Sequence, residues 1–385
     1  MSLFLSLLVS ISMAQEIRLR LLHHQKSIPV LAENIQLSEG TAQALTITYS
    51  EPQKKWLVLN QKNNGLSTEA AKTLELKAEN AIIHGRKLSG KFKLVWNEKN
   101  KSIDLIYPMD IDKYLLGVLP AEMPASWPLE ALKAQAVASR SYVLAQMQGQ
   151  THRHFDVDSS VMDQVFNKKK FEVLPANLKE KIRAAILQTQ KEVLFKGNRV
   201  YKTYFHARCG GHTENPKLVW NDSWSWNGKK DPYCDLGNAQ NWAYSISIDS
   251  LAQAYADDTN ENIGTITKIV AGKKTNSGRS DHIFLFFEDG RIRKWSSQNL
   301  RKSIGFSNIK STLFNIVLNK ETVSFRGKGF GHGVGLCQFG SRQMASLGKK
   351  HSEILEFYYP DAQLRSVFQW PAFLAKLQEK TLQVK

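Results

Sequence analysis

The sequence predicts an α+β fold in which a strand-rich N-terminal region precedes a domain of mixed helices and antiparallel strands. Two observations predict it. Between residues 16 and 108, short runs alternate apolar and polar side chains, which is the period of strands with one buried face. From Asp112 onward, apolar residues recur instead at the spacing of amphipathic helices. With 385 residues, 42% of them hydrophobic, the chain is long enough for more than one core and too apolar for intrinsic disorder.

Residues 1–14 form an apolar segment that ends in small residues at Ala14. They resemble the end of a cleaved signal peptide, although no Lys or Arg precedes the apolar run. A buried N-terminal strand is the alternative. A transmembrane helix is not expected, because crossing a bilayer takes roughly 20 apolar residues. We therefore expect an exported protein, periplasmic or at the cell envelope, with no transmembrane anchor in the mature chain.

The region 15–105 is predicted to be rich in β-strands, because clusters of polar turn residues separate its alternating runs. It contains no grouping of reactive side chains. The clearest strand segments are 17–22, 45–49, 56–59 and 102–107.

The pattern changes to helices at Asp112, and Pro120 and Pro124 are expected to interrupt the first helix. A second helix should begin beside Pro128, since proline suits a first helical turn, and run to about Gln148. The other expected elements are a helix at 176–191, a strand at 199–206, hairpins within 264–297 that turn at Gly278 and Gly290, a strand near Ser324, and helices at 338–347 and 352–358, before a C-terminal tail at 366–385.

The chain is strongly basic, because 52 Lys and Arg against 35 Asp and Glu give a formal net charge of +17. Such a balance attracts polyanions, and the candidates are nucleic acid, anionic membrane surfaces and acidic wall polymers. The basic residues are scattered in pairs and triplets, such as Lys168 to Lys170, without a dense arm or a motif interleaved with aromatic residues. We therefore expect no nucleic-acid partner.

Glu122 lies between Pro120 and Pro124 and is followed by Trp127, just before the second predicted helix. Packing against Met123 and Trp127 would remove water from its carboxyl group and favour the protonated form that a general acid needs. The N-terminus of the following helix would favour the carboxylate instead. A structural alternative is that Glu122 caps that helix through its free N–H groups.

A second motif places glycine at every second position from Gly327 to Gly335. One face of this extended segment carries no side chains, so another backbone or a ligand can approach it closely. His332 would project from the opposite face or from a turn, in a structural or a functional role. The run does not fit Gly-x-Gly-x-x-Gly, because His332 and Leu336 stand where the third glycine would fall, so dinucleotide binding is not expected.

Two histidines and two cysteines form a third group, which consists of His206, Cys209, His212 and Cys234. These are the residue types of a closed tetrahedral zinc site. In an exported protein the competing interpretation is a Cys209–Cys234 disulfide. Closing that loop of about 25 residues would contribute roughly 3 kcal/mol. We favour the disulfide because of the compartment, which leaves Cys337 as a small buried residue.

Together these segments resemble the stage II sporulation protein D (SpoIID) family of lytic transglycosylases, along with related domains described as amidase enhancers. The resemblance covers residues 106–365 and depends on motifs in the family's order. These are Glu122-Met-Pro with Trp127-Pro128 and Ala131 to Ala138, Phe155-Asp156 with Asp163-Gln164-Val165-Phe166, Cys209-Gly-Gly-His-Thr, and Gly327 to Leu336 with Gln338. The sequence departs from the family's usual serine at Cys337 and from its usual alanine at Ser139.

The resemblance implies a SpoIID-like catalytic domain with Glu122 as the catalytic acid. The implied substrate is the glycan strand of peptidoglycan, already stripped of its peptides by a cell-wall amidase. The reaction requires no cofactor, but one structure in the family is associated with zinc, so a structural zinc stays open. The substrate-contacting positions that the resemblance implies are Lys133, Arg140, Gln164, His212, Thr213, His332 and Gln338.

The implied chemistry needs one carboxyl group. Ordinary glycosidases use two, whereas a lytic transglycosylase replaces water by the C6 hydroxyl of the sugar and forms a 1,6-anhydro ring. Asp156 and Asp163 are available as a second carboxylate, so hydrolysis also stays open. Two further alternatives are a non-catalytic glycan-binding module that stimulates an amidase and a zinc-dependent hydrolase. The latter is weakened because four protein ligands would leave the metal no place for water.

Overall fold

The structure of the protein is a computed structural model that describes residues 16–37, 40–60, 65–66, 71–149, 153–160, 163–220, 226–234, 241–261, 264–367 and 372–373. The chain forms two compact units. The first consists of Met1–Pro124, Val143–Ile186 and Val367–Lys385, and the second of Ala125–Tyr142 and Leu187–Ser366. Residues 1–14 and most of the tail lie outside the described residues, so the signal peptide stays a prediction.

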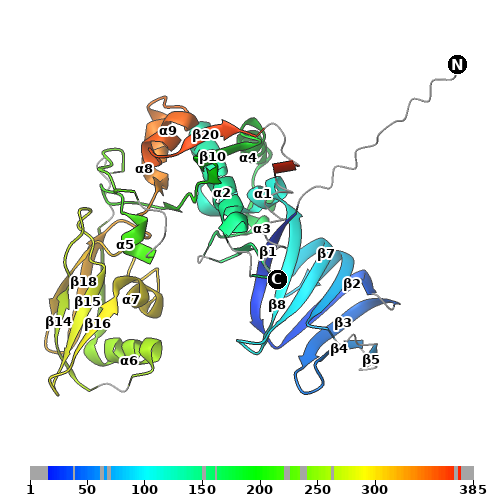
Figure 1. Cartoon of the computed structure of the whole chain (residues 1–385), viewed down its shortest axis with the longest axis horizontal. Helices are drawn as coiled ribbons and strands as arrows, with labels where there is room; N and C mark the ends of the chain where they lie inside the picture. The colour runs from blue at the N-terminus through cyan, green and yellow to red at the C-terminus, as the bar shows by residue number, and fades with distance from the viewer. Residues whose placement is uncertain are drawn as a thin grey trace. The chain divides into compact units, whose positions relative to one another are not determined.

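A nine-stranded sheet dominates the first unit (Figure 1). Its strands are β1 (Glu16–Gln25), β2 (Ser27–Leu37), β3 (Gly40–Ser50), β4 (Lys55–Asn60), β5 (Gly65–Leu66), β6 (Thr73–Ile83), β7 (Arg86–Asn97), β8 (Ser102–Asp110) and β9 (Val157–Asp158). They lie in the order β5-β4-β3-β2-β6-β7-β8-β1-β9, and only the β1–β9 pair is parallel. Burial alternates along β1, where Ile17, Leu19 and Leu21 face the core. The predicted β-rich N-terminal region is therefore confirmed, and so is the α+β class.

Helix α1 (Ile111–Glu122) follows β8 directly. The predicted interruption at Pro120 is wrong, because the helix continues beyond it. Proline removes the hydrogen bond of its own missing N–H and crowds the carbonyl four residues before it. The next turn nevertheless closes, with the N–H of Met123 donating to Leu119 O at 3.0 Å. Helix α3 (Lys168–Glu172) packs against α1, and α4 (Ala176–Gln188) follows it.

The second unit contains the first part of α2 (Leu129–Gly149), as far as Tyr142. Around it are β10 (Glu192–Lys196), β11 (Arg199–Val200), β12 (Phe205–His206), α5 (Pro216–Trp220), β19 (Leu336–Cys337), α8 (Gln338–Ser346), α9 (His351–Tyr358) and β20 (Gln363–Ser366). The predicted single strand at 199–206 is wrong. β11 pairs with β10, whereas β12 pairs with β19, so the chain changes partner in between, which no local pattern reveals.

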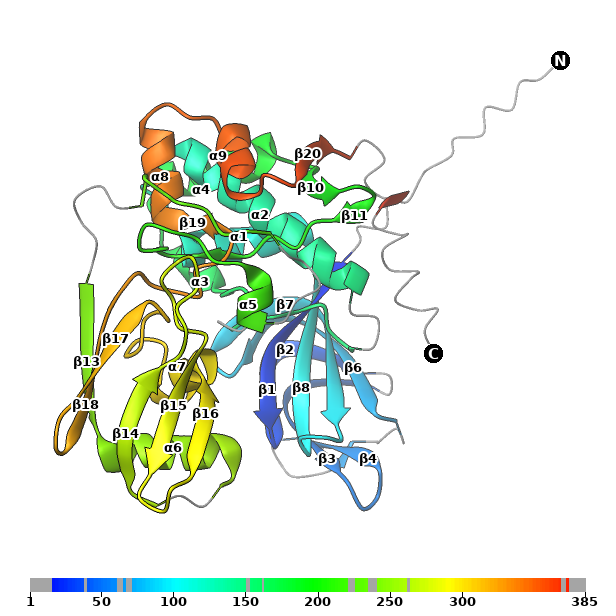
Figure 2. The same ribbon diagram turned by 60° about the vertical axis from the view of Figure 1, so that its left-hand side comes forward.

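Residues 241–328 of the second unit form two three-stranded antiparallel sheets and two helices around one apolar core (Figure 2). The elements are β13 (Asn241–Ser247), α6 (Ile248–Thr259), β14 (Ile266–Ala271), β15 (His282–Phe287), β16 (Ile292–Ser296), α7 (Ser297–Ile304), β17 (Phe314–Leu318) and β18 (Thr322–Lys328). The predicted turns at Gly278 and Gly290 are confirmed, with φ of +79° and +85°.

Helices α6 and α7 were not predicted. Their N-caps Ser247 and Ser296 are the signal that could have located them, since serine accepts hydrogen bonds from the N–H groups of the first turn. Within the described part of the chain, no helix combines the length and the apolar character needed to cross a lipid bilayer.

Candidate functional site

Glu122 is the last residue of α1 and is half-buried. Its carboxylate oxygen Oε1 accepts a hydrogen bond from the backbone N–H of Val165 at 2.9 Å. Two of the sequence motifs, 43 residues apart, therefore meet at this carboxyl group. The alternative in which Glu122 only caps the following helix does not account for this contact.

Tyr114 and Gln164 hold the segment that carries Val165. The hydroxyl of Tyr114 donates to Gln164 Oε1 at 3.2 Å, and its ring stacks on Phe166 with centroids 5.7 Å apart. Burial, reinforced by the charges of nearby acids including Glu122, raises the pKa of Tyr114 well above its usual value, so the phenol stays a neutral donor. Gln164 is fully buried. It therefore supports this segment from the interior, and its predicted contact with substrate stays a prediction.

The two acids that left hydrolysis open are held by other partners. Asp156 is 3% exposed, and Arg18 donates to its Oδ1 at 2.7 Å. Asp163 accepts hydrogen bonds from Gln146 Nε2 at 3.0 Å and from the N–H of Asp158 at 2.9 Å.

Gly117 lets α1 approach Phe166, because a Cβ at this position would lie 2.4 Å from a ring carbon. We predict that Gly117→Ala lowers the free energy of unfolding by about 1–3 kcal/mol through overpacking. This exceeds the gain of about 1 kcal/mol that alanine brings to a helix interior. Displacing the ring should also shift Val165 from Glu122. Urea denaturation measures the first effect, with Gly149→Ala as the control because its Cβ would meet nothing within 4 Å. Equal stability of the two variants would contradict this packing.

The glycine run packs against the chain between Tyr204 and Glu214, both in the second unit. β12 pairs with β19, and isolated bridges join Arg208 to Phe330 and Glu214 to Val334. A Cβ at Gly335 would lie 2.0 Å from Tyr204 O, and its φ of +72° is one that L-residues rarely adopt. The prediction that this run permits close approach is confirmed, and another backbone is what approaches.

Arg279 is a supporting residue that the sequence did not indicate. It is 1% exposed, and its guanidinium donates to His212 O at 2.8 Å and to Cys209 O. A Cβ at Gly333 would lie 2.5 Å from its central carbon. Arg279 thus ties the Cys209 motif to the glycine run. Its carbonyl partners are 67 and 70 residues away, beyond the reach of any local pattern.

His332 belongs to an aromatic group in the second unit. Its ring centroid lies 4.7 Å from that of Trp220, which is 42% exposed and stacks on Tyr204 at 4.4 Å. The ring is enclosed although the residue is half-buried, and burial beside His206 lowers the pKa of His332 well below its usual value. The N–H of Val334 donates to Nδ1 at 3.0 Å. The imidazole is therefore neutral, with its proton on Nε2.

Three other predicted substrate-contacting residues lie in the interior. Arg140 is fully buried and donates to Thr189 O at 2.9 Å. Thr213 is 3% and Gln338 5% exposed. The enclosed side chains of these three residues support the backbone around them, and their contact with substrate stays a prediction. His212 is half-buried, with its Nδ1 2.7 Å from Thr213 O.

Lys133 takes part in an ion-pair group of the second unit. Its Nζ lies 2.7 Å from Glu130 Oε1. Both ring nitrogens of His351 face carboxylates, Nδ1 that of Glu130 and Nε2 that of Glu192, each at 3.0 Å, so His351 is a double donor and carries a positive charge. Burial alone would raise the pKa of Glu130, but hydrogen bonds from Lys133 and His351 lower it to about 2.

This group predicts a pH-dependent contribution to stability. Hydrogen bonding to Glu192 raises the pKa of His351 above its usual value of 6.5. The contribution is therefore complete below about pH 6.5 and is lost as pH rises through the raised pKa. We predict that His351→Gln lowers the free energy of unfolding by about 1–3 kcal/mol at about pH 6, and by less at about pH 9. Urea denaturation at both pH values checks this, with the exposed His84→Gln as control. An equal loss at both would contradict it.

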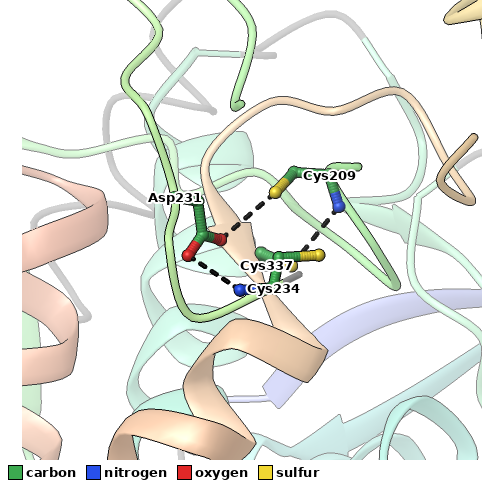
Figure 3. A group of neighbouring side chains, drawn as sticks. All are labelled: Cys209, Asp231, Cys234 and Cys337. Atoms are coloured by element: carbon green, nitrogen blue, oxygen red, sulfur yellow. Dashed lines mark hydrogen bonds between the residues drawn. The ribbon is translucent and has the colours of Figure 1, made fainter. Parts of the chain in front are cut away.

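The predicted Cys209–Cys234 disulfide is not formed, because all three cysteines are free. Cys209, Asp231, Cys234 and Cys337 instead form a buried group whose ligand atoms lie within 4.8 Å of one another (Figure 3). His206 and His212 of the predicted zinc set are not members of this group. Cys337 enters it because β19 pairs with β12, a pairing that Cys spacing alone does not indicate.

Two family models match the chain. The model described as Stage II sporulation protein (SpoIID) matches residues 99–195, which include Glu122 and Val165. The model described as Domain of unknown function (DUF8618) matches residues 225–335, which include the 241–328 core and most of the glycine run.

The chain is also similar to individual proteins over much of its length. It is 32% identical over 266 residues to an uncharacterized protein of Brachyspira hyodysenteriae, an alignment that covers 68% of each chain. It is 26% identical over 332 residues to Stage II sporulation protein D of Bacillus subtilis, covering 83% of this chain and 92% of that protein. It is 28% identical over 302 residues to the Amidase enhancer of Bacillus subtilis, covering 66% of this chain and 40% of that protein.

Proposed function

Because the chain belongs to the stage II sporulation protein D (SpoIID) family, we propose that it is a lytic transglycosylase that cleaves peptidoglycan glycan strands. The observation that carries the proposal is the position of Glu122, half-buried at the end of α1 with Oε1 bound by the N–H of Val165. Substrate in the cell wall requires export, in agreement with the apolar segment at residues 1–14.

Glu122 acts first as acid and then as base. Its proton passes to the glycosidic oxygen, so the bond from that oxygen to C1 breaks and the leaving sugar departs as an alcohol. The C6 hydroxyl oxygen then bonds to C1 while its proton passes to Glu122. One C–O bond has replaced another, Glu122 is again protonated, and no water has been consumed.

Two features of the surroundings of Glu122 support this role. As the last helical residue, Glu122 lies at the negative end of the helix dipole, which disfavours an ionised carboxylate. The N–H of Val165 donates to Oε1 and thereby fixes the orientation of the carboxyl group. The carboxyl group is thereby oriented before substrate binds, which is the condition for efficient proton transfer.

Peptide-free strands are the proposed substrate. Removing the peptides exposes the lactyl carboxylates of muramic acid, and a chain with a net charge of +17 attracts them. In the second unit, Trp220 is exposed and stacks on Tyr204, and it offers an apolar face of the kind that suits a sugar ring.

The proposal is tested by digesting peptide-free and intact glycan strands with the purified protein and identifying the products by mass spectrometry. We expect 1,6-anhydro-muramyl ends, with more from the peptide-free strands. Absence of such ends from both substrates would rule out the activity.

The similarity to the Amidase enhancer favours a second candidate, a non-catalytic glycan-binding module that stimulates a cell-wall amidase. The two candidates differ at Glu122. If the module only binds, Glu122→Gln leaves both glycan binding and amidase stimulation unchanged, and no anhydro product is formed by the original protein either.

A further inference from the structure

We propose that Cys209, Asp231, Cys234 and Cys337 bind a structural zinc ion within the second unit. All four residues are buried, and one ligand atom from each lies within 4.8 Å of the others. Tetrahedral zinc with Zn–S bonds of about 2.3 Å separates its sulfur ligands by roughly 3.8 Å. The group therefore already has nearly the size of an occupied site, and small side-chain rotations would complete it.

The four ligands come from three separate segments of the chain, as Figure 3 shows. Cys209 follows β12, Asp231 and Cys234 share one turn, and Cys337 ends β19. A metal ion would join these segments where the fold has few regular elements. Residues 207–215 belong to no helix or strand, and the β-bridges that they form, to the glycine run and to Lys230, are isolated ones.

Asp231 is oriented toward the thiols by its other partners. Its Oδ1 accepts hydrogen bonds from the N–H groups of Tyr233 and Cys234, at 3.0 and 3.1 Å. Its Oδ2 accepts from the hydroxyl of Tyr358 at 2.9 Å and lies 3.2 Å from Cys209 Sγ. Such outer hydrogen bonds are what hold a ligating carboxylate in place. Zinc would replace the thiol proton between Cys209 and this oxygen.

Backbone N–H groups fix the position of the Cys337 sulfur. Its Sγ accepts hydrogen bonds from the backbone N–H groups of Cys209 and Gly340, both at 3.4 Å. The second donor belongs to the first turn of α8, for which Cys337 is the N-cap. Cysteine is not among the preferred N-cap residues. Once bound to zinc, the sulfur would be negatively charged, and the positive end of the helix would stabilise that charge.

The donor set selects the metal and its role. Three soft thiolates with tetrahedral spacing favour zinc over magnesium or calcium, which prefer oxygen ligands. Four protein ligands leave no open position, so the ion would stabilise the fold and take no part in the cleavage reaction. Three thiolates and a carboxylate around Zn²⁺ leave a net negative charge. The buried guanidinium of Arg279, which donates to Cys209 O, supplies a counter-charge.

The test is the metal content of the purified chain, measured by mass spectrometry after purification without chelators and again after dialysis against zinc. We expect about one zinc per chain. Substitution of Co²⁺ should give the intense visible and near-ultraviolet bands of a tetrahedral thiolate site. A metal-free protein after both treatments, or one with a Cys209–Cys234 disulfide, would overturn the proposal.

Variants identify the ligands independently of glycan cleavage. Cys337→Ser and Asp231→Asn should each weaken zinc binding at least about tenfold, measured by competition with a chelating dye. His206→Gln and His212→Ala change the two histidines outside the group and should retain the metal. Loss of zinc from His206→Gln together with full retention in Asp231→Asn would overturn this ligand set. Because zinc binding is read without substrate, its failure is distinct from a failure of the transglycosylase proposal.

Discussion

Glu122→Gln is expected to lower the rate of glycan cleavage by about 10²- to 10⁴-fold, the range that a positioned acid–base group contributes. The amide has the shape of the carboxyl group and its oxygen can still accept the hydrogen bond from Val165 N–H. It cannot transfer the proton that the glycosidic oxygen needs. Cleavage rates with peptide-free strands measure the effect.

Two control measurements show whether Glu122→Gln still folds and still binds glycan. Thermal unfolding and the affinity for glycan should match those of the original protein, because Gln preserves the volume and the Val165 contact. Glu122→Asp should retain part of the activity, since a shorter acid can still donate a proton. A Glu122→Gln protein within about tenfold of the original rate would show that the acid is another residue.

Gly335→Ala is expected to destabilise the second unit by more than about 3 kcal/mol. The added Cβ would lie 2.0 Å from the backbone oxygen of Tyr204, the residue just before β12. A backbone atom cannot move aside without displacing the chain on either side of it. A positive φ costs alanine a further 1–2 kcal/mol or so. Chemical denaturation of the purified variant measures the loss.

Gly348→Ala separates the cost of the steric overlap from the cost of the positive φ. Gly348 also has positive φ, +83°, but its added Cβ would meet nothing within 4 Å. Gly348→Ala should therefore lower the free energy of unfolding only by the cost of placing alanine at a positive φ, about 1–2 kcal/mol. Equal losses in the two variants would contradict the close approach of β19 to the chain at Tyr204.

Local patterns predicted the elements that depend on local physics. Alternation identified the N-terminal strands, helical spacing identified α2, α8 and α9, and turn glycines located the hairpins. The partner change between β11 and β12 was missed because strand pairing is a non-local property. The continuation of α1 past Pro120 was missed because proline disfavours a helix, yet the turn after it still closes.

The candidate site also has features that the sequence predicted and features that appear only in the folded chain. The motif around Glu122 was visible in sequence, but its contact with Val165 appears only when α1 and the following segment pack together. Arg140, Gln164 and Gln338 belong to the motifs, but that they are buried appears only once distant segments have packed around them. Asp231 stands three residues before Cys234 in a turn, the one local signal that could have added it to the cysteine group.

Digestion of peptide-free glycan in water enriched in heavy oxygen tests the proposed reaction most directly. If Glu122 delivers the C6 hydroxyl to C1, the new ends are 1,6-anhydro rings, lighter than hydrolytic ends by one water and free of the label. Reducing ends that contain heavy oxygen would mean that water attacks C1, which would contradict the single-carboxyl mechanism.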